Sequence, residues 1–409
     1  MDSKNLVPEN ELQEMRNYFE NEDFAGAVEE VKKYLEDIDQ VPLNIAVTGE
    51  PGSGKSTFIN VIRGLNDEEK DSAKTGVVET TMSPTAYLHP HHRNVRYWDL
   101  PGIGSPGFKP MDYLKLVEFD RYDFFLIITT ERFRECHILL AQAIQSMGKK
   151  FYFLRSKIDS DLKGYKRGRA NCYKEEDILK KIREDSINGL KAGGIGNPQV
   201  FLLSCLEPDK YDFYLIQKTL EDELPSHKRH IFLLSQPNFF QQALKKKRKT
   251  FRLHIWKWAI VSMMNVITSQ FSGAHRALSV PHLSTNGDLT LIVNVLEEYK
   301  KAFGLDTRSL QLLADTFGKD PEDLRSVIET PTASQEITHE LVFHHLNSQG
   351  LTDMGRLVTA CTNQFVPKIS TLASGGIAFG TTYWILSSFL ANMAEDAARV
   401  LSKALEASD

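Results

Sequence analysis

Residues 49–56 constrain the fold of this chain more than any other segment. They read GEPGSGKS and fit the pattern G-x-x-x-x-G-K-[ST]. The apolar run 43–48 before them predicts a buried strand, and residues 57–63 after them predict a helix. A strand, a glycine-rich loop and a helix in this order are the setting in which the pattern forms a phosphate-binding P-loop. The sequence therefore predicts a nucleoside triphosphate site here.

The residue types of this loop suit phosphate chemistry. Gly52 and Gly54 allow the backbone to curl so that its N–H groups point at phosphate oxygens. The helix that follows adds the positive end of its dipole. We expect Lys55 to place its charge between the β- and γ-phosphates, and the Ser56 hydroxyl to ligate Mg²⁺.

A second motif, DLPG at residues 99–102, follows the predicted strand 95–98 and fits D-x-x-G. We expect Asp99 to support Mg²⁺ through water and the Gly102 N–H to sense the γ-phosphate. Ile103 comes next, where many small GTPases carry a Gln that orients the attacking water. Because isoleucine cannot polarise water, hydrolysis must recruit another group or stay slow.

The base is indicated by SKID at residues 156–159, which approximates the guanine-reading pattern [NT]-K-x-D. The Asp159 carboxylate can accept from both the N1–H and the amine of guanine, and adenine offers no such pair. This favours GTP and disfavours an ordinary P-loop ATPase. The stem of Lys157 can lie along the base, and Ser204 and Cys205 sit where a supporting loop contacts it.

The first switch is expected in residues 74–81, between the P-loop and D-x-x-G. Its Thr hydroxyl closes on Mg²⁺ in the triphosphate state of GTPases. We favour Thr75 for this role, since Gly76 permits the loop to hinge there. Thr80 and Thr81 are the alternatives, and a mobile linker without any ligand is another.

Strand-like runs alternate with helical ones from residue 43 to Pro225, which predicts a mostly parallel, doubly wound sheet covered on both faces. The predicted strands are 43–48, 95–98, 124–128, 151–154 and 200–203. Beyond Pro225 we expect helices at 237–271, 288–303, 307–317, 321–329, 334–348 and about 381–405.

The predicted fold class is thus an α/β P-loop GTPase domain inserted in an all-α helical domain. Residues 1–41 form amino-terminal helices that pack with the helical domain, residues 42–225 form the GTPase domain, and residues 226–409 form the carboxyl-terminal helical domain. A chain of 409 residues is long enough for two domains.

Net charge and cysteine content argue against several classes of protein. The net charge of -5 argues against a nucleic-acid binder, and four dispersed cysteines argue against a disulfide framework or a zinc site. The amino terminus lacks an apolar signal core, and Asp2 stands where N-myristoylation needs glycine. We therefore expect a cytoplasmic protein.

Two segments leave alternatives open. Residues 369–394 carry no charge and are long enough to span a bilayer, but glycines and hydroxyl residues dilute them. We favour a buried helical hairpin there, and a membrane span or a membrane-contacting element are the alternatives. The basic run at 245–249 suits anionic lipid or nuclear import, whereas a solvated helix face is the favoured interpretation.

Together these motifs resemble the interferon-inducible immunity-related GTPases, a vertebrate family of dynamin-like character. The resemblance covers most of the chain. It is most specific at residues 52–56, 74–79, 98–104, 122–125, 157–161, 224–230 and 299–304.

This resemblance implies a Mg²⁺-dependent GTPase with a GKS-type P-loop, which binds GTP and GDP and assembles with itself. In the family, GTPase domains pair face to face and activate one another, and Glu79 matches the switch Glu at that interface. It also implies a G-domain dimer and higher oligomers, related GTPases as partners, and peripheral association with internal or pathogen-containing vacuolar membranes.

Two functions remain open: a GTP-hydrolysing, self-assembling protein of innate immunity, and a low-turnover, GTP-dependent switch that binds and controls related GTPases. The residues expected to act in catalysis are Lys55, Ser56, Thr75, Glu79 and Gly102. Metal contacts are expected from Ser56, Thr75 and, through water, Asp99. The residues expected to bind nucleotide are Gly49, Gly52, Ser53, Gly54, Lys55, Ser56, Thr57, Thr75, Gly76, Asp99, Gly102, Lys157, Asp159, Ser160, Ser204 and Cys205.

Overall fold

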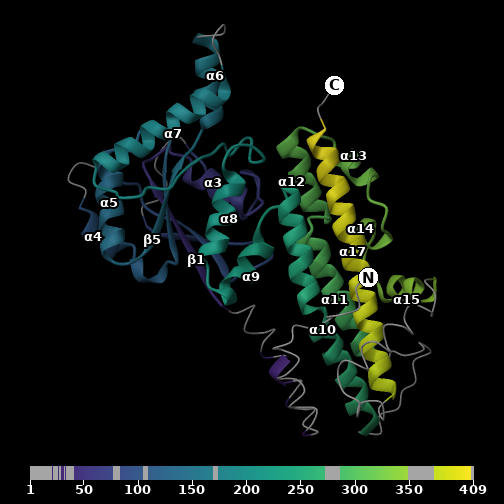
Figure 1. Cartoon of the computed structure of the whole chain (residues 1–409). Helices are drawn as coiled ribbons and strands as arrows, with labels where there is room; N and C mark the ends of the chain where they lie inside the picture. The colour runs from purple at the N-terminus through teal and green to yellow at the C-terminus, as the bar shows by residue number, and fades with distance from the viewer. Residues whose placement is uncertain are drawn as a thin grey trace. The chain divides into compact units, whose positions relative to one another are not determined.

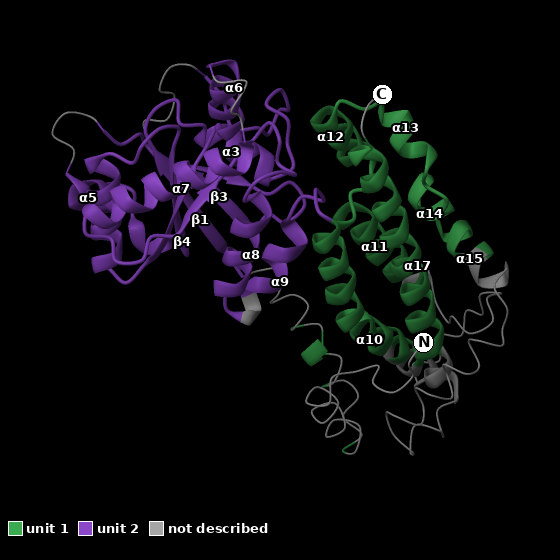
Figure 2. Ribbon diagram, turned by 45° about the horizontal axis from the view of Figure 1, so that its top comes forward, with its two compact units in different colours: residues 1–38, 241–409 green, residues 39–240 purple. Residues whose placement is uncertain are grey.

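The computed structural model describes two compact units of the chain. The described residues are 21, 26, 29–31, 33, 41–76, 83–104, 109–168, 174–271, 286–348 and 373–406. One unit comprises residues 39–240, and the other combines residues 1–38 with residues 241–409 (Figure 2). The first unit is therefore inserted in sequence between the two parts of the second.

The inserted unit is built on a six-stranded sheet with the strand order β2-β3-β1-β4-β5-β6 (Figure 1). β2 runs antiparallel to β3, and the other neighbours are parallel. The strands are β1 (Leu43–Gly49), β2 (Thr85–Leu88), β3 (Val95–Asp99), β4 (Phe124–Thr129), β5 (Lys150–Arg155) and β6 (Val200–Leu202). The expected mostly parallel sheet is confirmed.

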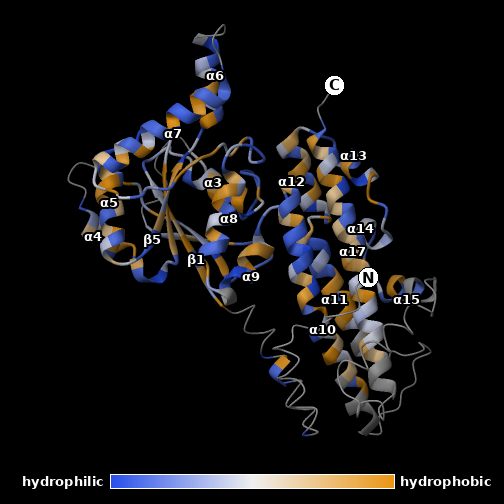
Figure 3. Cartoon of the chain, viewed as in Figure 1, coloured by the Kyte–Doolittle hydropathy of each residue, from blue (hydrophilic) through white to orange (hydrophobic). Residues whose placement is uncertain are grey.

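Helices cover both faces of this sheet, because in strands such as β4, which is apolar from Phe124 to Ile128, the side chains on both faces must be buried. The hydrophobic strands appear in orange in Figure 3. One face packs against α3 (Lys55–Ile62), α8 (Phe213–Glu223) and α9 (Ser226–Ser235). The other packs against α4 (Pro110–Leu116), α5 (Glu135–Ser146), α6 (Ile158–Gly168) and α7 (Glu175–Ala192). A short 3₁₀ helix, η1 (Phe119–Arg121), precedes β4.

The strand order places the loops that follow β1, β3 and β4 at one edge. β1 pairs with β3 on one side and with β4 on the other, so the chain reverses its winding direction at β1. In open parallel sheets, ligands bind outside the carboxyl ends of the strands at such a switch point. The P-loop follows β1 and the D-x-x-G motif follows β3, so both lie at this edge.

The second unit is helical and is organised around two long helices, α10 (Gln241–Phe271) and α17 (Ala373–Leu405), which pack along each other. Thr382 Oγ1 donates to Ser262 Oγ at 2.9 Å across this interface. The other helices in the described part of this unit are α11 (Asn286–Ala302), α12 (Thr307–Phe317), α13 (Pro321–Ser326), α14 (Pro331–Ser334) and α15 (His339–Ser348).

The structure corrects several expectations about single elements. β2 was not foreseen, because three of its four side chains are exposed and none of the usual apolar alternation marks it. The helix expected at 334–348 begins only at His339, as α15, and Ser334 is the last residue of the separate helix α14. The helix expected at 321–329 ends at Ser326.

The favoured hairpin in residues 369–394 is also wrong. From Ala373 onward the segment is one continuous helix, and its side chains from Ala378 to Ala394 are mostly buried. Glycine disfavours helix by about 1 kcal/mol per residue, but packing along a long neighbour outweighs this local preference. Among the described residues, no helix combines the length and hydropathy that a membrane span needs.

The favoured solvated face for the basic run 245–249 is wrong at one position. Lys247 is only 1% exposed, and its Nζ donates to the carbonyl of Ala302 at 2.8 Å. Lys245, Arg248 and Lys249 are exposed, as expected.

Candidate nucleotide-binding site

The P-loop has a backbone that only glycine tolerates at its two ends. Gly49 has φ 150°, and a Cβ there would lie 2.0 Å from the carbonyl oxygen of Ile128 on β4. Gly54, which caps the amino end of α3, is left-handed with φ 89°. Because the loop turns sharply between these residues, α3 begins directly beside it with its amino end facing the loop.

Lys55 is held within the loop. Its Nζ donates to the carbonyl oxygens of Gly49 and Glu50, each at 3.2 Å, and the residue is 8% exposed. The ammonium group is therefore positioned by backbone atoms before any phosphate arrives. A bound phosphate provides stronger, charge-assisted acceptors at the same place.

Ser56 and Asp99, two of the three residues expected at the metal, are brought together. The Ser56 hydroxyl donates to Asp99 Oδ2 at 2.9 Å, and Asp99 is 1% exposed. With its proton directed at the carboxylate, the hydroxyl oxygen keeps its lone pairs for a cation. Hydroxyl and carboxylate oxygens are ligands that Mg²⁺ prefers, so this donor set fits the ion.

The D-x-x-G motif is tied to the P-loop through the backbone. Ile103 N donates to Gly49 O at 3.3 Å, and Leu100 N donates to Val47 O at 3.0 Å. Ile103 is 1% exposed and packs in the core on the α4 and α5 face of the sheet. Its side chain therefore fills space inside the domain and has no polar atom to offer a water molecule.

The guanine motif is also linked to the P-loop. The Ser156 hydroxyl donates to Ser53 O at 2.7 Å, and Lys157 Nζ donates to Gly52 O at 3.1 Å. Lys157 has φ 57°, an unusual conformation for a non-glycine residue that turns its side chain over the loop. The stem of Lys157 thus reaches from the guanine motif to the phosphate loop.

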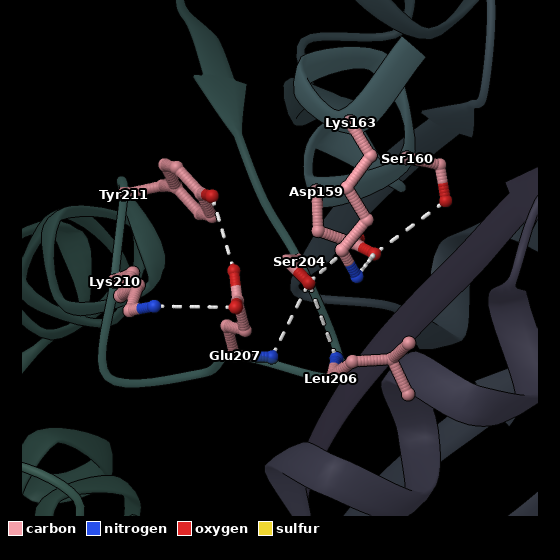
Figure 4. Close-up of polar contacts among 8 residues, drawn as sticks. All are labelled: Asp159, Ser160, Lys163, Ser204, Leu206, Glu207, Lys210 and Tyr211. Carbon is pink, nitrogen blue, oxygen red and sulfur yellow. Dashed lines mark hydrogen bonds and ion pairs between the residues drawn. The ribbon is translucent and has the colours of Figure 1, made fainter. Parts of the chain in front are cut away.

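Asp159 is a buried carboxylate with an oriented partner (Figure 4). Ser204 Oγ donates to Asp159 Oδ1 at 2.8 Å, while it accepts from the backbone N–H groups of Leu206 and Glu207 at 3.3 and 3.2 Å. Since two amides occupy the acceptor sites of the hydroxyl, its single proton must point at the carboxylate. Ser204 therefore fixes the orientation of Asp159.

The second carboxylate oxygen has weaker partners. Lys163 Nζ and Ser160 Oγ both lie 3.4 Å from Asp159 Oδ2, and the Lys163 side chain is 66% exposed (Figure 4). Ser160 thus faces the carboxylate. Oδ2 is the oxygen that remains easiest to reach for an incoming N–H donor.

Cys205 lies next to Ser204 and packs partly against the core on the α3 and α8 face. Burial, together with the carboxylates of Asp67 and Asp159, raises the pKa of its thiol to about 12. The thiol is therefore neutral at physiological pH. It provides a small, apolar neighbour to the base site and no charge.

The first-switch residues are only partly described. Thr75 and Gly76 are exposed. The hydrogen bond that brings Ser56 and Asp99 together is made without Thr75. Glu79, Thr80 and Thr81 lie outside the described residues. Just before the switch, Asn60 of α3 holds Ala73, donating to its carbonyl at 2.9 Å and accepting from its N–H at 2.6 Å.

Sequence reasoning missed Asn60, Lys163 and Arg134. Arg134, at the amino end of α5, pairs with Glu50 of the P-loop at 3.0 Å. The signal for Lys163 was its position four residues after Asp159 on one helix. Asn60 and Arg134 have partners that are distant in sequence, so no local pattern marks them.

Comparison with known proteins decides the family. The sequence matches the profile described as Interferon-inducible GTPase (IIGP) over residues 8–404. The chain belongs to the interferon-inducible GTPase family. The resemblance noted from the sequence motifs is thereby confirmed, and as an interferon-inducible GTPase the chain binds and hydrolyses GTP in immunity.

Two relatives of this interferon-inducible GTPase show how far the similarity extends. Interferon-inducible GTPase 5 of Bos taurus is 42% identical over 401 residues, which is 98% of this chain and 83% of that protein. Interferon-gamma-inducible GTPase 10 of Mus musculus is 37% identical over 404 residues, 98% of this chain and 91% of that protein.

Among solved structures, Toc33 from Arabidopsis thaliana, in complex with Mg²⁺ and GMPPNP, matches with 15% identity and a TM-score of 0.30. The match covers 44% of this chain and 78% of that one.

Proposed function

We propose that this interferon-inducible GTPase reads guanine through Asp159 and assembles through its GTPase domains on internal or pathogen-containing vacuolar membranes in cell-autonomous immunity. The observation that carries the nucleotide part is the buried Asp159 carboxylate, oriented by Ser204 beside a P-loop that Lys157 and Ser156 contact. A carboxylate fixed in this way presents two acceptors to the two adjacent N–H groups of guanine.

Mg²⁺ is part of the proposal. Ser56 would hold the ion directly, and Asp99 would hold one of its waters. When bound, the ion neutralises charge on the β- and γ-phosphates. Thr75 is proposed as the switch ligand, and the exposed position of Thr75 and Gly76 leaves this loop room to move.

The buried Ile103 supports activation by a second molecule. No polar side chain occupies the position from which a Gln orients water in other GTPases. A group supplied from outside accelerates such enzymes by about 10³–10⁵-fold. We infer that this group comes from a second copy of the chain, through the switch segment around Glu79.

The test is the rate of GTP hydrolysis per molecule as a function of protein concentration, with light scattering to follow assembly. We expect the specific rate to rise with concentration, and Glu79→Ala to lose this rise while keeping its affinity for GTP. Lys55→Ala, which removes the phosphate contact, serves as the inactive control. A wild-type rate that does not depend on concentration would contradict activation by a second copy.

A second candidate function is a low-turnover, GTP-dependent switch that binds and controls related GTPases. The same buried Ile103 favours it, because slow hydrolysis suits a regulator. The concentration series separates the two candidates. A regulator stays slow by itself and instead changes the rate or assembly of a related GTPase that is added to it.

A further inference from the structure

The basic run on α10 is divided between the interior and the surface of the helical unit. Leu244, Lys247, Phe251 and Ile255 are each no more than 5% exposed and define the inner face of the helix. Lys247 donates to Ala302 O, which lies at the carboxyl end of α11. Four residues later, Phe251 packs against Tyr299 of α11 with ring centroids 4.6 Å apart.

These inward contacts fix how the helix is rotated about its axis. With α10 held against α11 at two successive turns, the other basic residues must point elsewhere. Lys245, Arg248, Lys249 and Arg252 are all exposed and follow the spacing i, i+3, i+4 and i+7 of one helix face. We name these four residues the α10 basic stripe.

The α10 basic stripe is not neutralised within the described part of the helical unit. Ion pairs of this unit form at Arg325, Arg399 and Lys403, none of which belongs to the stripe. From Lys245 to Arg252 the stripe extends about 10 Å along the helix axis. Leu253, 46% exposed, continues the row that Lys245 and Lys249 begin. A row of cations with an exposed leucine at one end is typical of a surface that lies on a bilayer.

We propose that the α10 basic stripe is the surface through which the helical unit contacts an anionic lipid bilayer. Lipid headgroups supply the negative charge, and Leu253 reaches the boundary between headgroups and acyl chains. The exposed Leu253 favours a bilayer over nucleic acid as the occupant, because an apolar side chain can enter the acyl boundary of a membrane but finds no such partner on a phosphate backbone. This inference rests on the membrane association in the proposed function and assigns it to particular residues.

The experiment measures partitioning of the full chain onto phosphatidylcholine vesicles with and without phosphatidylserine, at low and at high salt. We expect binding to need phosphatidylserine and to weaken with salt. Arg248→Gln combined with Lys249→Gln should lower the partition coefficient about 25-fold, since each basic side chain near such a surface is worth about fivefold. The matched control, Lys181→Gln with Lys191→Gln on α7, removes the same charge and should bind as the wild type does.

Substitution of Lys247 distinguishes a folded basic stripe from a linear stretch of charge. If the run acted only as a linear stretch of charge, Lys247→Met would weaken binding as much as Lys249→Gln. The folded stripe instead predicts no change, because Lys247 does not reach the surface. Circular dichroism checks that the variant is folded. A gain-of-function variant tests the stripe without relying on Lys247→Met remaining folded. Gln242→Lys adds a positive charge at an exposed position beside the stripe and should raise the partition coefficient about fivefold.

Three results would overturn the proposal: wild-type binding by the double variant, equal losses in Lys247→Met and Lys249→Gln, or preference for RNA or DNA over the vesicles. GTP hydrolysis without vesicles is measured in parallel on every variant. It should stay at the wild-type rate, so failure of the stripe remains distinguishable from failure of the nucleotide assignment.

Discussion

At the scale of single residues, the site is organised by hydrogen bonds that leave few orientations open. Asp159 and Ser204 show this most clearly, since the two amides that Ser204 accepts determine where its proton goes. The sequence predicted both residues, because each follows a predicted strand in a recognisable motif. It did not predict their mutual contact, which depends on the folding of segments 45 residues apart.

Replacing Asp159 by Asn should shift nucleotide preference from guanosine towards xanthosine. The Ser204 proton keeps the amide oxygen at the Oδ1 position, which directs the amide nitrogen to the Oδ2 position. There it can donate to the carbonyl that xanthine has in place of the guanine amine. Titration of fluorescent guanosine and xanthosine diphosphates measures this. Unchanged discrimination would remove Asp159 from the base site.

Replacing Lys163 by Ala should tighten binding of GDP by up to about fivefold. Its ammonium lies 3.4 Å from the buried Asp159 Oδ2 and competes with the base for that oxygen, but the lysine side chain is 66% exposed, so solvent screening limits the pair to about 1 kcal/mol or less. Lys166→Ala, an exposed lysine on the same helix, is the matched control. Weaker GDP binding by Lys163→Ala would mean that the lysine supports the nucleotide instead.

At the scale of elements, some strands could be predicted from the local sequence pattern, whereas other strands and helices depend on tertiary packing. The apolar strands β1 and β4 were predictable from sequence because they are buried on both faces. β2 was not, since an exposed edge strand carries no strong period. The continuity of α17 was obscured by its glycines, and it depends on α10 as a partner.

The buried Lys247 on α10 should make stability depend on pH. Burial lowers the pKa of Lys247 from 10.5 to about 7. Between these values the unfolded chain binds more protons than the folded one, so this residue makes stability rise with pH above about 7, by up to about 1.4 kcal/mol per unit.

Denaturant unfolding of the wild type and of Lys247→Met between pH 7 and 8.5 tests this. Below pH 9, ionisation of unfolded cysteine and tyrosine adds little to the difference between the two proteins. The wild type should gain stability relative to the variant as the pH rises. Parallel curves would show that Lys247 remains charged in the folded protein.

At the scale of the whole molecule, the sequence predicted two domains with one inserted in the other. The compact units of the structure divide at residues 38–39 and 240–241. α9 and the segment up to Phe240 lie within the sheet unit, because Ile231 and Phe232 complete its core. The sequence offered Pro225 as a natural boundary, and this packing is not visible in a local pattern.

We therefore expect residues 39–240, expressed alone, to fold and to bind GTP with the affinity of the full chain. A fragment that ends at residue 225 should be less stable, because it lacks Ile231 and Phe232. Loss of two such buried side chains costs about 3–6 kcal/mol. Thermal melting and GTP titration of both fragments check this, and equal stability would show that α9 is dispensable.

The buried lysine has a consequence for heat measurements. Near pH 8.5 each folded molecule keeps Lys247 largely neutral, and unfolding draws a proton from the buffer to charge it. The calorimetric enthalpy of unfolding then includes the ionisation heat of whichever buffer supplies that proton. Scans in buffers of different ionisation enthalpy should give different unfolding enthalpies for the wild type. For Lys247→Met the dependence should shrink by close to one proton, so calorimetry can count the proton that the helical core excludes.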